Sequence, residues 1–452
     1  MPKPPAKNQS GRPAGPGRRP EGETAQRPNR RPEGETARKV VRGFAAPSPT
    51  VFGALLSHPE PIRAAGAAAP VIQPGGAAPT GAGFGAVPAK ADPSFLLDLD
   101  GKRPLVGMTK EELKAFVESL GEPAFRAKQL FQWVYQKGAT TFDQMTNLSA
   151  AFRAKLAENA RLKLCTSEVA QQAEPTRTTK YLFQLPDGQK VESVLMRHNY
   201  GNAVCVTTQV GCRMGCSFCA STFGGLVRNL LAGEIVDQIL VMGADLPEGQ
   251  RIDSVVLMGS GEPMENYDQV LKAVRLMHDP DGLNIGYRHI TLSTSGLVPA
   301  IYRLTEEEIP ITLALSLHAP NDRLRSELMP VNRVWPVQEV LTATRHYAET
   351  TGRRVTYEYI LIEEVNDNPE EAEQLAALLK GSLAHVNLIP MNPVAERPQY
   401  RRPSRERIKR FAEILQGYGL ETTVRREMGG DIDAACGQLR NRVERQRNRA
   451  RS

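Results

Sequence analysis

Long apolar runs are scarce in this 452-residue chain, and their scarcity excludes whole classes of protein. No uninterrupted apolar stretch reaches the roughly 20 residues that a membrane helix needs. The opening residues, MPKPPAKNQS, carry positive charge but no apolar stretch behind it, so no secretion signal is predicted. A chain of this length can bury a large core in two or three domains. We therefore expect a cytoplasmic protein with no membrane partner.

Cysteine is also rare. Six cysteines are too few for a disulfide-stabilised scaffold in a chain this long, which favours a reducing compartment. Four of them are nevertheless crowded into CVTTQVGCRMGCSFCAS, residues 205–221. Cys212, Cys216 and Cys219 form a C-x3-C-x2-C pattern, and Cys205 stands seven residues before it. Such crowding indicates a site that uses sulfur chemistry.

The middle of the chain lacks an excess of positive charge. Residues 1–90 carry 13 Lys and Arg against 5 Asp and Glu, a net charge of +8, and residues 440–452 carry 6 Arg against 1 Glu, a net charge of +5. Taking both from the chain's +7 leaves −6 for residues 91–439. Any contact of that part with nucleic acid must therefore come from local patches and not from an overall field.

Both ends of the chain differ from its middle in composition. Residues 1–91 are rich in Pro, Gly, Ala and Arg and contain the octet RRPEGETA twice. Such a segment cannot bury enough apolar surface to offset its ordering entropy, so we predict a disordered arm. The arm is either a plain linker or a tether for RNA. Residues 440–452 form a second basic stretch, a short tail.

Residues 93–160 predict a small helical domain. Thr109 and Glu112 have the spacing of a capping box, and Ser149 can cap a later helix. Basic residues and three aromatic residues, Phe131, Trp133 and Tyr135, could face RNA, which would make this an RNA-binding accessory domain. The alternative is that the aromatic residues belong to the core, which is the more common fate of helix-spaced aromatics.

The rest of the chain predicts an α/β fold. The segments TKYLFQL, QKVESVLMR and AVCVTT alternate as strands do, and they predict a β-rich connector over residues 165–208. In residues 209–439, apolar strand patterns alternate with helical stretches, at 254–259, 289–294, 311–318, 354–361 and 384–390. Repeated βα units predict a parallel sheet or a partial, open βα barrel behind the helical domain. Ligands of such folds gather at the carboxyl ends of the strands.

Three closely spaced cysteines fit an iron–sulfur cluster better than zinc. A structural zinc site requires four protein ligands. Three thiolates can bind three irons of a [4Fe–4S] cluster and leave the fourth iron open. Gly211 and Gly215 allow a tight loop that turns the sulfurs toward one point. Zinc bound by the three cysteines with Cys205, His198 or Cys436 is the alternative.

The segment GCRMGCSFC resembles the cluster motif of the radical S-adenosylmethionine superfamily. Five further motifs occur in order: MGSGEP, TLSTSG, LALSLHAPND, NLIPMNP and GDIDAACGQL. Together they resemble the bacterial adenosine C2-methyltransferases that act on 23S ribosomal RNA and on tRNA. The resemblance runs from about residue 93 to about residue 440. The first ~90 residues have no counterpart in that family's pattern.

The resemblance implies a fold of the radical SAM type and two cofactors. Cys212, Cys216 and Cys219 would bind a [4Fe–4S] cluster whose open iron chelates S-adenosylmethionine. One electron then cleaves the sulfonium to a 5′-deoxyadenosyl radical. Such a route is needed because C2 of adenine, between two ring nitrogens, is electron-poor. The residues implied as cofactor contacts are Gly261, Glu262, Ser293, Ser316, Leu317, His318 and Asn392. Ser293 as a helix cap and His318 as a core histidine are the alternatives.

Three further residues are implied in the transfer of the methyl group. A second S-adenosylmethionine would first methylate Cys436 in AACG, so two are used per turnover. The radical takes a hydrogen from that methyl group, and the resulting methylene adds to C2. Glu192 in VESV matches the family's proton acceptor, and Cys205 matches the thiol that attacks Cys436 and releases the product as a disulfide. A solvated Glu192 and a buried, inert Cys436 are the alternatives; Cys165 receives no role.

The expected substrates are adenosine at the peptidyl transferase centre of 23S rRNA and adenosine next to the anticodon of tRNA. RPQYRRPSRERIKR, residues 397–410, offers seven Arg and Lys for phosphate contacts, or it is a solvated helix face. The resemblance also implies an electron donor such as flavodoxin or ferredoxin, and we expect a monomer. Two rival functions stay open. One is a related C8-methylating resistance enzyme, and the other is a zinc-stabilised RNA-binding protein without catalytic activity.

Overall fold

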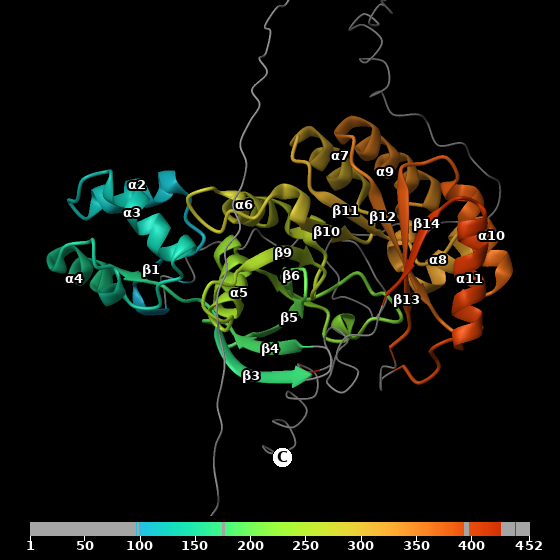
Figure 1. Cartoon of the computed structure of the whole chain (residues 1–452), viewed down its shortest axis with the longest axis horizontal. Coiled ribbons are helices and arrows are strands. Elements are labelled where there is room, and N and C mark those ends of the chain that lie inside the picture. Colours follow the sequence, from blue (N-terminus) through green and yellow to red (C-terminus); the bar gives the residue numbers. More distant parts are fainter. Residues whose placement is uncertain (1–95, 97–98, 174–176, 393–396, 426–438, 440–452) are drawn as a thin grey trace, which may run out of the picture. The chain divides into compact units, whose positions relative to one another are not determined.

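The structure is a computed structural model, and it describes residue 96 and residues 99–173, 177–392, 397–425 and 439. The predicted arm, the basic tail and Cys436 lie outside these residues. In the part described, no helix is both long enough and apolar enough to cross a membrane. The predicted α/β architecture is confirmed there (Figure 1).

Three predicted helices form the front of the described chain. They are α2 (Lys110–Ser119), α3 (Arg126–Phe131) and α4 (Ala150–Asn159). Thr109 and Glu112 close the predicted capping box on α2, and Ser149 caps α4 through its hydroxyl. After α3 the chain continues as a π-helical turn, Gln132–Gln136, and a 3-10 turn follows at Phe142–Gln144. Two short strands, β1 (Arg103–Pro104) and β2 (Ala160–Arg161), pair in parallel at the base of the helices.

A ten-stranded sheet carries the rest of the fold, in the order β14-β13-β12-β11-β10-β9-β6-β5-β4-β3. Its strands from β6 to β14 are parallel, and β3 to β6 are antiparallel neighbours. The bounds are β3 (Thr166–Ala173), β4 (Thr178–Gln184), β5 (Lys190–His198), β6 (Gly201–Cys205), β9 (Ile252–Leu257), β10 (Ile290–Thr294), β11 (Thr312–Ser316), β12 (Val355–Leu361), β13 (Ala384–Pro390) and β14 (Glu421–Val424). The sheet therefore runs without a break across the boundary predicted at residue 208.

Helices connect the parallel strands, as the βα pattern predicts. They are α5 (Ala232–Ala244), α6 (Tyr267–His278), α7 (Val298–Glu306), α8 (Asp322–Leu328), α9 (Val337–Thr351), α10 (Pro369–Leu379) and α11 (Arg405–Gly417). Figure 1 shows α7 and α9 beside β10 and β11, and α10 and α11 beside the strands that follow. This arrangement brings the carboxyl ends of β9 to β13 to one edge of the sheet.

Ion pairs join the front helices to the sheet domain. Lys110 lies 2.7 Å from Asp279, and Lys128 lies 3.1 Å from Asp281, both in the loop after α6. Lys272 on α6 reaches back to Glu112 on α2 at 2.7 Å. Apolar side chains from the front helices and from the sheet domain also belong to one continuous buried cluster. The two parts are therefore packed together and do not merely follow one another in sequence.

Candidate active site

A small hairpin positions the cysteine loop. Strands β7 (Gln209–Gly211) and β8 (Leu226–Asn229) pair in antiparallel fashion on either side of it. Gly211 has a φ of +81°, and a Cβ there would lie 2.0 Å from the carbonyl oxygen of Gly225. Only glycine fits such a close backbone approach. The predicted glycine-dependent turn is therefore present at this position.

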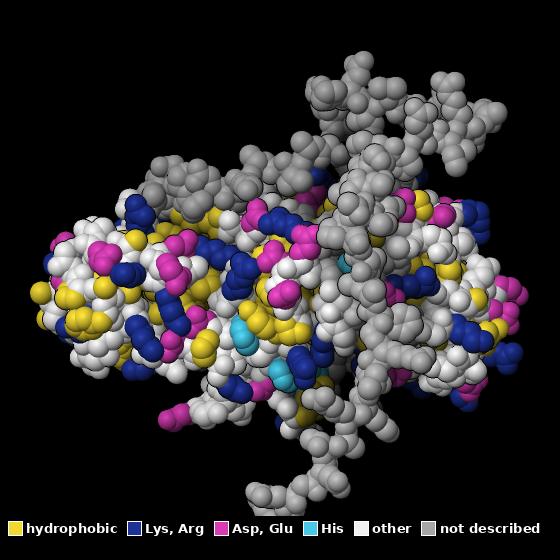
Figure 2. Space-filling model, turned by 90° about the horizontal axis from the view of Figure 1, so that it is seen from above, with side chains coloured by type: hydrophobic (Ala, Val, Ile, Leu, Met, Phe, Trp, Pro, Cys, Tyr) yellow, Lys and Arg dark blue, Asp and Glu magenta, His cyan; other side chains and the backbone are white. Residues whose placement is uncertain are grey.

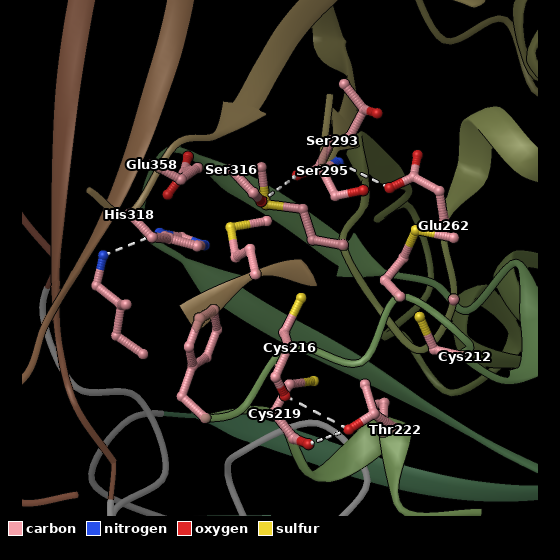
Figure 3. Close-up of a pocket in the computed structure, with 18 of the residues that line it drawn as sticks. Cys212, Cys216, Cys219, Thr222, Glu262, Ser293, Ser295, Ser316, His318 and Glu358 are labelled. Atoms are coloured by element: carbon pink, nitrogen blue, oxygen red, sulfur yellow. Dashed lines mark hydrogen bonds between the residues drawn. The ribbon is translucent and has the colours of Figure 1, made fainter. Parts of the chain in front are cut away.

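Backbone hydrogen bonds fix the loop between its cysteines. The Cys212 amide donates to the Gly225 carbonyl at 3.0 Å, and the Cys219 amide donates to the Cys216 carbonyl at 3.1 Å. The Thr222 hydroxyl donates to the Cys219 carbonyl at 2.9 Å. These bonds leave the three sulfur atoms on one side of the loop, toward a common space (Figure 3).

That space is a cavity of about 260 Å³ at the carboxyl ends of the parallel strands. All three cysteines line it. Five of the residues implied as cofactor contacts line it as well: Gly261, Glu262, Ser293, Ser316 and His318. Figure 3 shows these side chains converging on the cavity from the cysteine loop and from the strand ends. Residues far apart in sequence, from Cys212 to Arg425, thus meet in one pocket.

The chemistry of the three thiols fits a metal cluster. Burial, and next the neighbouring thiols, raise the pKa of Cys212 and of Cys216 well above the ordinary range. The protein alone would keep these sulfurs protonated, so a cationic partner such as iron is needed to hold them as thiolates. Among the described residues, no three His, Cys, Asp or Glu side chains are gathered around a point that could hold a single metal ion. A four-iron cluster takes one thiolate per iron and requires no such point.

Gly261 and Glu262 form the wall of the cavity after β9. A Cβ on Gly261, whose φ is +107°, would lie 2.6 Å from Cβ of Gln209. The Glu262 carboxylate accepts hydrogen bonds from the backbone amides of Ser295, at 2.7 Å, and Met264, at 3.0 Å. Burial raises the pKa of Glu262, and these amides oppose that effect. The carboxylate is therefore fixed at the rim of the pocket by the backbone.

Ser293 and Ser316 project from adjacent strands into the same space. Their hydroxyl oxygens are 3.5 Å apart, on β10 and β11. Helix α7 begins five residues after Ser293 with Leu297 as its N-cap, so the helix-cap alternative for Ser293 is wrong. Glu358 on β12 lies opposite Ser316 in the sheet and also lines the cavity, where burial raises its pKa.

His318 is a neutral, anchored ring. Its Nδ1 accepts a hydrogen bond from the Ile360 amide at 3.0 Å, so Nε2 carries the ring proton. Burial, and next the nearby Arg325 guanidinium, lower the pKa of His318 to about 3. The ring lines the cavity and packs edge-on against Phe218 of the cysteine loop, with 5.0 Å between ring centroids. His318 is therefore a satisfied buried histidine that also lines the cavity, and its role as a cofactor contact stays a prediction.

Two implied contacts do not line the cavity. The side chain of Leu317 is fully buried in the core, and its backbone amide donates to the Glu358 carbonyl at 3.1 Å. The Asn392 carboxamide oxygen lies 3.5 Å from the Arg402 guanidinium. Roles for both as cofactor contacts stay predictions.

Arg325 is a buried cation that the sequence did not indicate. It is 0% exposed and donates hydrogen bonds to the carbonyls of Ser295, Ser316 and Leu317, at 2.6, 3.2 and 3.1 Å. These carbonyls follow or end β10 and β11, so a single guanidinium ties two strand ends beside the pocket. Burial lowers its pKa to about 10, which leaves it protonated near neutral pH. Its helical surroundings, DRLRSEL, give no sequence signal for this position.

Glu192 and Cys205 lie on the cavity side of the sheet, in its antiparallel part. Cys205 on β6 is opposite Val194 on β5, so it shares a face with Glu192 two residues earlier. Following the register through β9 and β10 places Ser293 on that same face. Glu192 is buried and its carboxylate lies 2.8 Å from Nζ of Lys180. The alternative of a solvated, outward-facing Glu192 is therefore wrong.

The remaining cysteines are described only in part. The five described cysteines form no disulfide with one another. Cys436 lies outside the described residues, so its predicted approach to Cys205 stays a prediction. Cys165 is buried, its thiol contacts the Glu234 carbonyl at 3.6 Å, and burial raises its pKa. It is not among the residues that line the cavity.

The predicted RNA-facing aromatics are mostly core residues. Phe131 and Tyr135 are fully buried, and the Tyr135 hydroxyl donates to the Met108 carbonyl at 2.9 Å. Trp133 is partly exposed, with the Lys137 ammonium 3.8 Å from its ring centroid. On the face drawn in Figure 2, Lys and Arg side chains alternate with Asp and Glu, as expected for a body without a basic excess.

The basic segment 397–410 is divided between internal and outward-facing cations. Arg407 binds Asp367 with two contacts of 2.6 Å, and Arg401 lies 3.2 Å from Glu363. The Tyr400 hydroxyl donates to Ser217 of the cysteine loop at 2.9 Å. These residues hold the segment against the domain. A separate hollow between α11 and β14 is lined by other cations, Arg402, Arg405, Lys409 and Arg425.

Comparison with known sequences and structures agrees with this site. The family described as "Ribosomal RNA large subunit methyltransferase N-terminal domain" matches residues 104–162, and the "Radical SAM superfamily" matches residues 206–379. The chain is 70% identical over 362 residues to the probable dual-specificity RNA methyltransferase RlmN of Symbiobacterium thermophilum, which spans 80% of this chain and 98% of that protein. It is 54% identical over 345 residues to the protein of the same description in Desulforamulus reducens. That match covers 76% of this chain and 98% of the Desulforamulus protein.

A solved structure is similar as well. A radical SAM methyltransferase from Sphaerobacter thermophilus is 48% identical and superimposes with a TM-score of 0.72, over 74% of this chain and 98% of that one. The fold, the cysteine loop and the superfamily match define a radical SAM enzyme. Within that class, the chain belongs to the RlmN family of RNA methyltransferases. Membership implies a [4Fe–4S] cluster and S-adenosylmethionine, and it removes the zinc-protein alternative.

Proposed function

We propose that this chain methylates C2 of adenosine at two places in the cell. One is the peptidyl transferase centre of 23S rRNA, and the other is the position next to the anticodon in tRNA. The two relatives reported above are described as dual-specificity enzymes, which supports two RNA substrates. The carrying observation is the convergence of Cys212, Cys216 and Cys219 with strand-end polar residues on one cavity.

Within that cavity, the cysteine sulfurs hold the cluster, and the opposite wall holds S-adenosylmethionine. When bound, the two supply the radical that takes a hydrogen from the methyl group carried by Cys436. The residues proposed to contact S-adenosylmethionine are Gly261, Glu262, Ser293, Ser316, Leu317, His318 and Asn392. The neutral Nε2–H of His318 can donate a hydrogen bond but brings no charge near the sulfonium.

Residues of this chain then complete the transfer. The methylene on Cys436 adds to C2, which leaves the enzyme joined to RNA with one unpaired electron in the adduct. The cluster, when bound, would accept that electron, and the Glu192 carboxylate takes the C2 proton, so that the C–H bonding pair restores the ring. The Cys205 thiolate then attacks the Cys436 sulfur. A disulfide forms, the carbon–sulfur bond breaks, and the departing carbon takes a proton to become the methyl group.

The hollow between α11 and β14 is the proposed contact for RNA phosphates. Arg402, Arg405 and Lys409 line it together with Arg425, which also lines the cavity. Phosphate contacts there would place a splayed adenosine close to the cysteine loop. Charged contacts of this kind give affinity that depends on salt and not on sequence.

Three further properties belong to the proposal. The electron that starts each turnover comes from a small donor such as flavodoxin or ferredoxin. The chain works as a monomer, and it works in the cytoplasm. The RNA substrates and the oxygen-sensitive cluster both favour that reducing compartment.

The proposal is tested by anaerobic reconstitution of the wild-type chain and of the Cys436→Ala and Cys205→Ala variants. Each is incubated with S-adenosylmethionine, a reductant and unmodified bacterial RNA, and the ribonucleosides are analysed by mass spectrometry. We expect 2-methyladenosine from the wild type alone. We also expect Cys205→Ala to accumulate a covalent protein–RNA adduct, because nothing releases Cys436.

Other products would overturn parts of the scheme. A yield of 8-methyladenosine would keep the cysteine chemistry and move the chain to the C8 reaction. Methylation by Cys436→Ala at the wild-type rate would exclude a methyl carrier at that position. A wild-type protein that binds no iron–sulfur cluster under anaerobic reconstitution would overturn the whole proposal.

A further inference from the structure

Two lysine–glutamate pairs lie buried on one face of the antiparallel part of the sheet. Nζ of Lys180 lies 2.8 Å from Oε2 of Glu192, and the two side chains are 1% and 5% exposed. Lys190 pairs with Glu168, and the Lys190 side chain is 5% exposed. Neither lysine has a place in the reaction described above, although one of them contacts a proposed proton acceptor.

The register places only the first pair beside the resolving thiol. Lys180 on β4 is opposite Val194 on β5, and Val194 is opposite Cys205 on β6. Lys180 and Cys205 therefore flank β5 on the same face of the sheet as Glu192. Glu192 is the diagonal neighbour of each of them, and such neighbours lie roughly 7–8 Å apart, within reach of long side chains. Lys190 lies on β5 itself, four residues before Val194, and so it is further from Cys205.

Burial makes Glu192 depend on its partners. A buried carboxylate is costly unless it is paired and hydrogen-bonded, and the Lys180 ammonium lies close enough to pair with it. A buried ion pair rarely adds stability compared with apolar side chains of similar volume. A proton acceptor, however, must begin the step as a carboxylate. The pair is thus poorly explained by stability and well explained by the need to hold a base in place.

We propose that Lys180 is a positioning residue that holds the Glu192 carboxylate in place for removal of the C2 proton. This rests on the proposed function, in which the covalent adduct loses that proton to Glu192. In the step, the C2–H bond breaks, its electron pair stays with the ring, and an O–H bond forms on Glu192. Loss of Lys180 therefore slows the reaction after the adduct has formed and before Cys205 can release it.

The test compares Lys180→Met with Lys190→Met in the full-length, cluster-loaded protein. Methionine keeps much of the apolar stem and removes the charge. Lys190→Met removes a similarly buried lysine from a pair outside the proposed machinery, whose glutamate, Glu168, is 19% exposed. Each variant is given S-adenosylmethionine, reductant and an unmodified RNA transcript, and the covalent protein–RNA adduct is followed on denaturing gels. We expect Lys180→Met to form the adduct and to release it roughly 10²-fold more slowly than the wild type, the lower range of a general-base contribution. Lys190→Met should release it at the wild-type rate.

Two further variants separate positioning from damage to the fold. Lys180→Arg restores a cation, so it should recover most of the release rate. In a Glu192→Gln background, Lys180→Met should change the release rate by less than about twofold, because coupled residues are not additive. The iron–sulfur absorption of every variant reports whether the pocket has formed.

The outcomes distinguish a failure of the role proposed for Lys180 from a failure of the proposed function on which that role rests. Release by Lys180→Met as fast as by Lys190→Met overturns the inference, and so does a folded, cluster-loaded Lys180→Met that forms no adduct. Both results would leave the proposed function intact, provided that Cys205→Ala still traps the adduct. Absence of an adduct in Cys205→Ala overturns the proposed function itself, and the role of Lys180 with it.

Discussion

At the scale of single residues, His318 shows how burial and charge decide a protonation state. Its imidazole is held neutral because burial lowers its pKa to about 3, and Arg325 adds to the effect. The unfolded chain binds a proton at this imidazole below pH 6.5, and the folded chain does not. The stabilising contribution is therefore present above pH 6.5 and is lost progressively as the pH falls toward 3.

This sign predicts a difference between the wild type and His318→Asn. Asparagine tolerates the φ of +61° at this position and can accept the Ile360 hydrogen bond, but it does not titrate. Between pH 6 and 5, the unfolding free energy of the wild type should fall by about 1 kcal/mol more than that of the variant. Urea unfolding of both proteins at the two pH values measures this difference in unfolding free energy. Comparing the two proteins cancels the contribution of Asp237, which both contain. The pKa of this buried carboxyl is raised to about 6, so its effect on the pH dependence has the opposite sign. Equal pH slopes would mean that His318 is not held neutral.

The sequence predicted the reactive residues of the site better than the residues that support them. The three cysteines and Ser293, Ser316 and His318 stand in local motifs. Each of them reaches the pocket from its own loop or strand end. Arg325 acts through backbone carbonyls of two other strand ends, and Lys180 acts through a residue on the next strand. Such partners depend on strand order and register, which no short motif records.

At the scale of elements, the long periodic segments were predicted and the irregular ones were not. The strands with alternating or continuous apolar residues are all present, as are the capped helices α2 and α4. Strand β14 is short and mostly exposed, and Thr166–Ala173 is polar, so neither carries an apolar pattern. The π-helical turn Gln132–Gln136 continues α3 without any change in composition. These elements are fixed by their neighbours in the sheet or helix and not by their own residues.

The contact between α5 and the front of the chain gives a prediction at this scale. A Cβ on Gly233 would lie 2.3 Å from the Val106 carbonyl oxygen, so the helix and the chain after β1 touch through backbone. Gly233→Ala should lower the unfolding free energy by about 1–3 kcal/mol, the usual cost of overpacking. Gly243→Ala in the same helix is the matched control, because its Cβ would meet only Ile252, at 3.8 Å. That change should be neutral or raise stability by up to about 1 kcal/mol.

Thermal unfolding of the two alanine variants beside the wild type checks the prediction. The order of midpoints should be Gly243→Ala at or above the wild type, with Gly233→Ala below it. Equal loss in both variants would show that any substitution in α5 is harmful and that the close contact with Val106 has no special cost.

At the scale of the whole molecule, the uneven distribution of charge separates catalysis from RNA capture. Residues 1–90 carry +8, and the part matched by the Symbiobacterium relative is 80% of the chain and 98% of that relative. Family activity therefore needs no more than the matched part, while the basic arm can add long-range attraction to RNA. We expect a chain that begins at residue 92 to keep its methylation rate at saturating RNA, within about twofold.

RNA affinity should respond differently from the rate. Each phosphate contact that is lost makes the slope of log K against log salt shallower by about 0.7 to 0.9. The shortened chain should therefore bind RNA more weakly at low salt and with a shallower slope, measured by filter binding over a series of salt concentrations. The matched control keeps the arm's length and replaces its 13 Lys and Arg by Gln. If attraction is electrostatic, that variant should bind like the shortened chain, because only charge has been removed. If it binds like the wild type, the arm acts through its length or its uncharged residues. If removal of the arm leaves the slope of log K against log salt unchanged, the arm is a linker that contacts no phosphate.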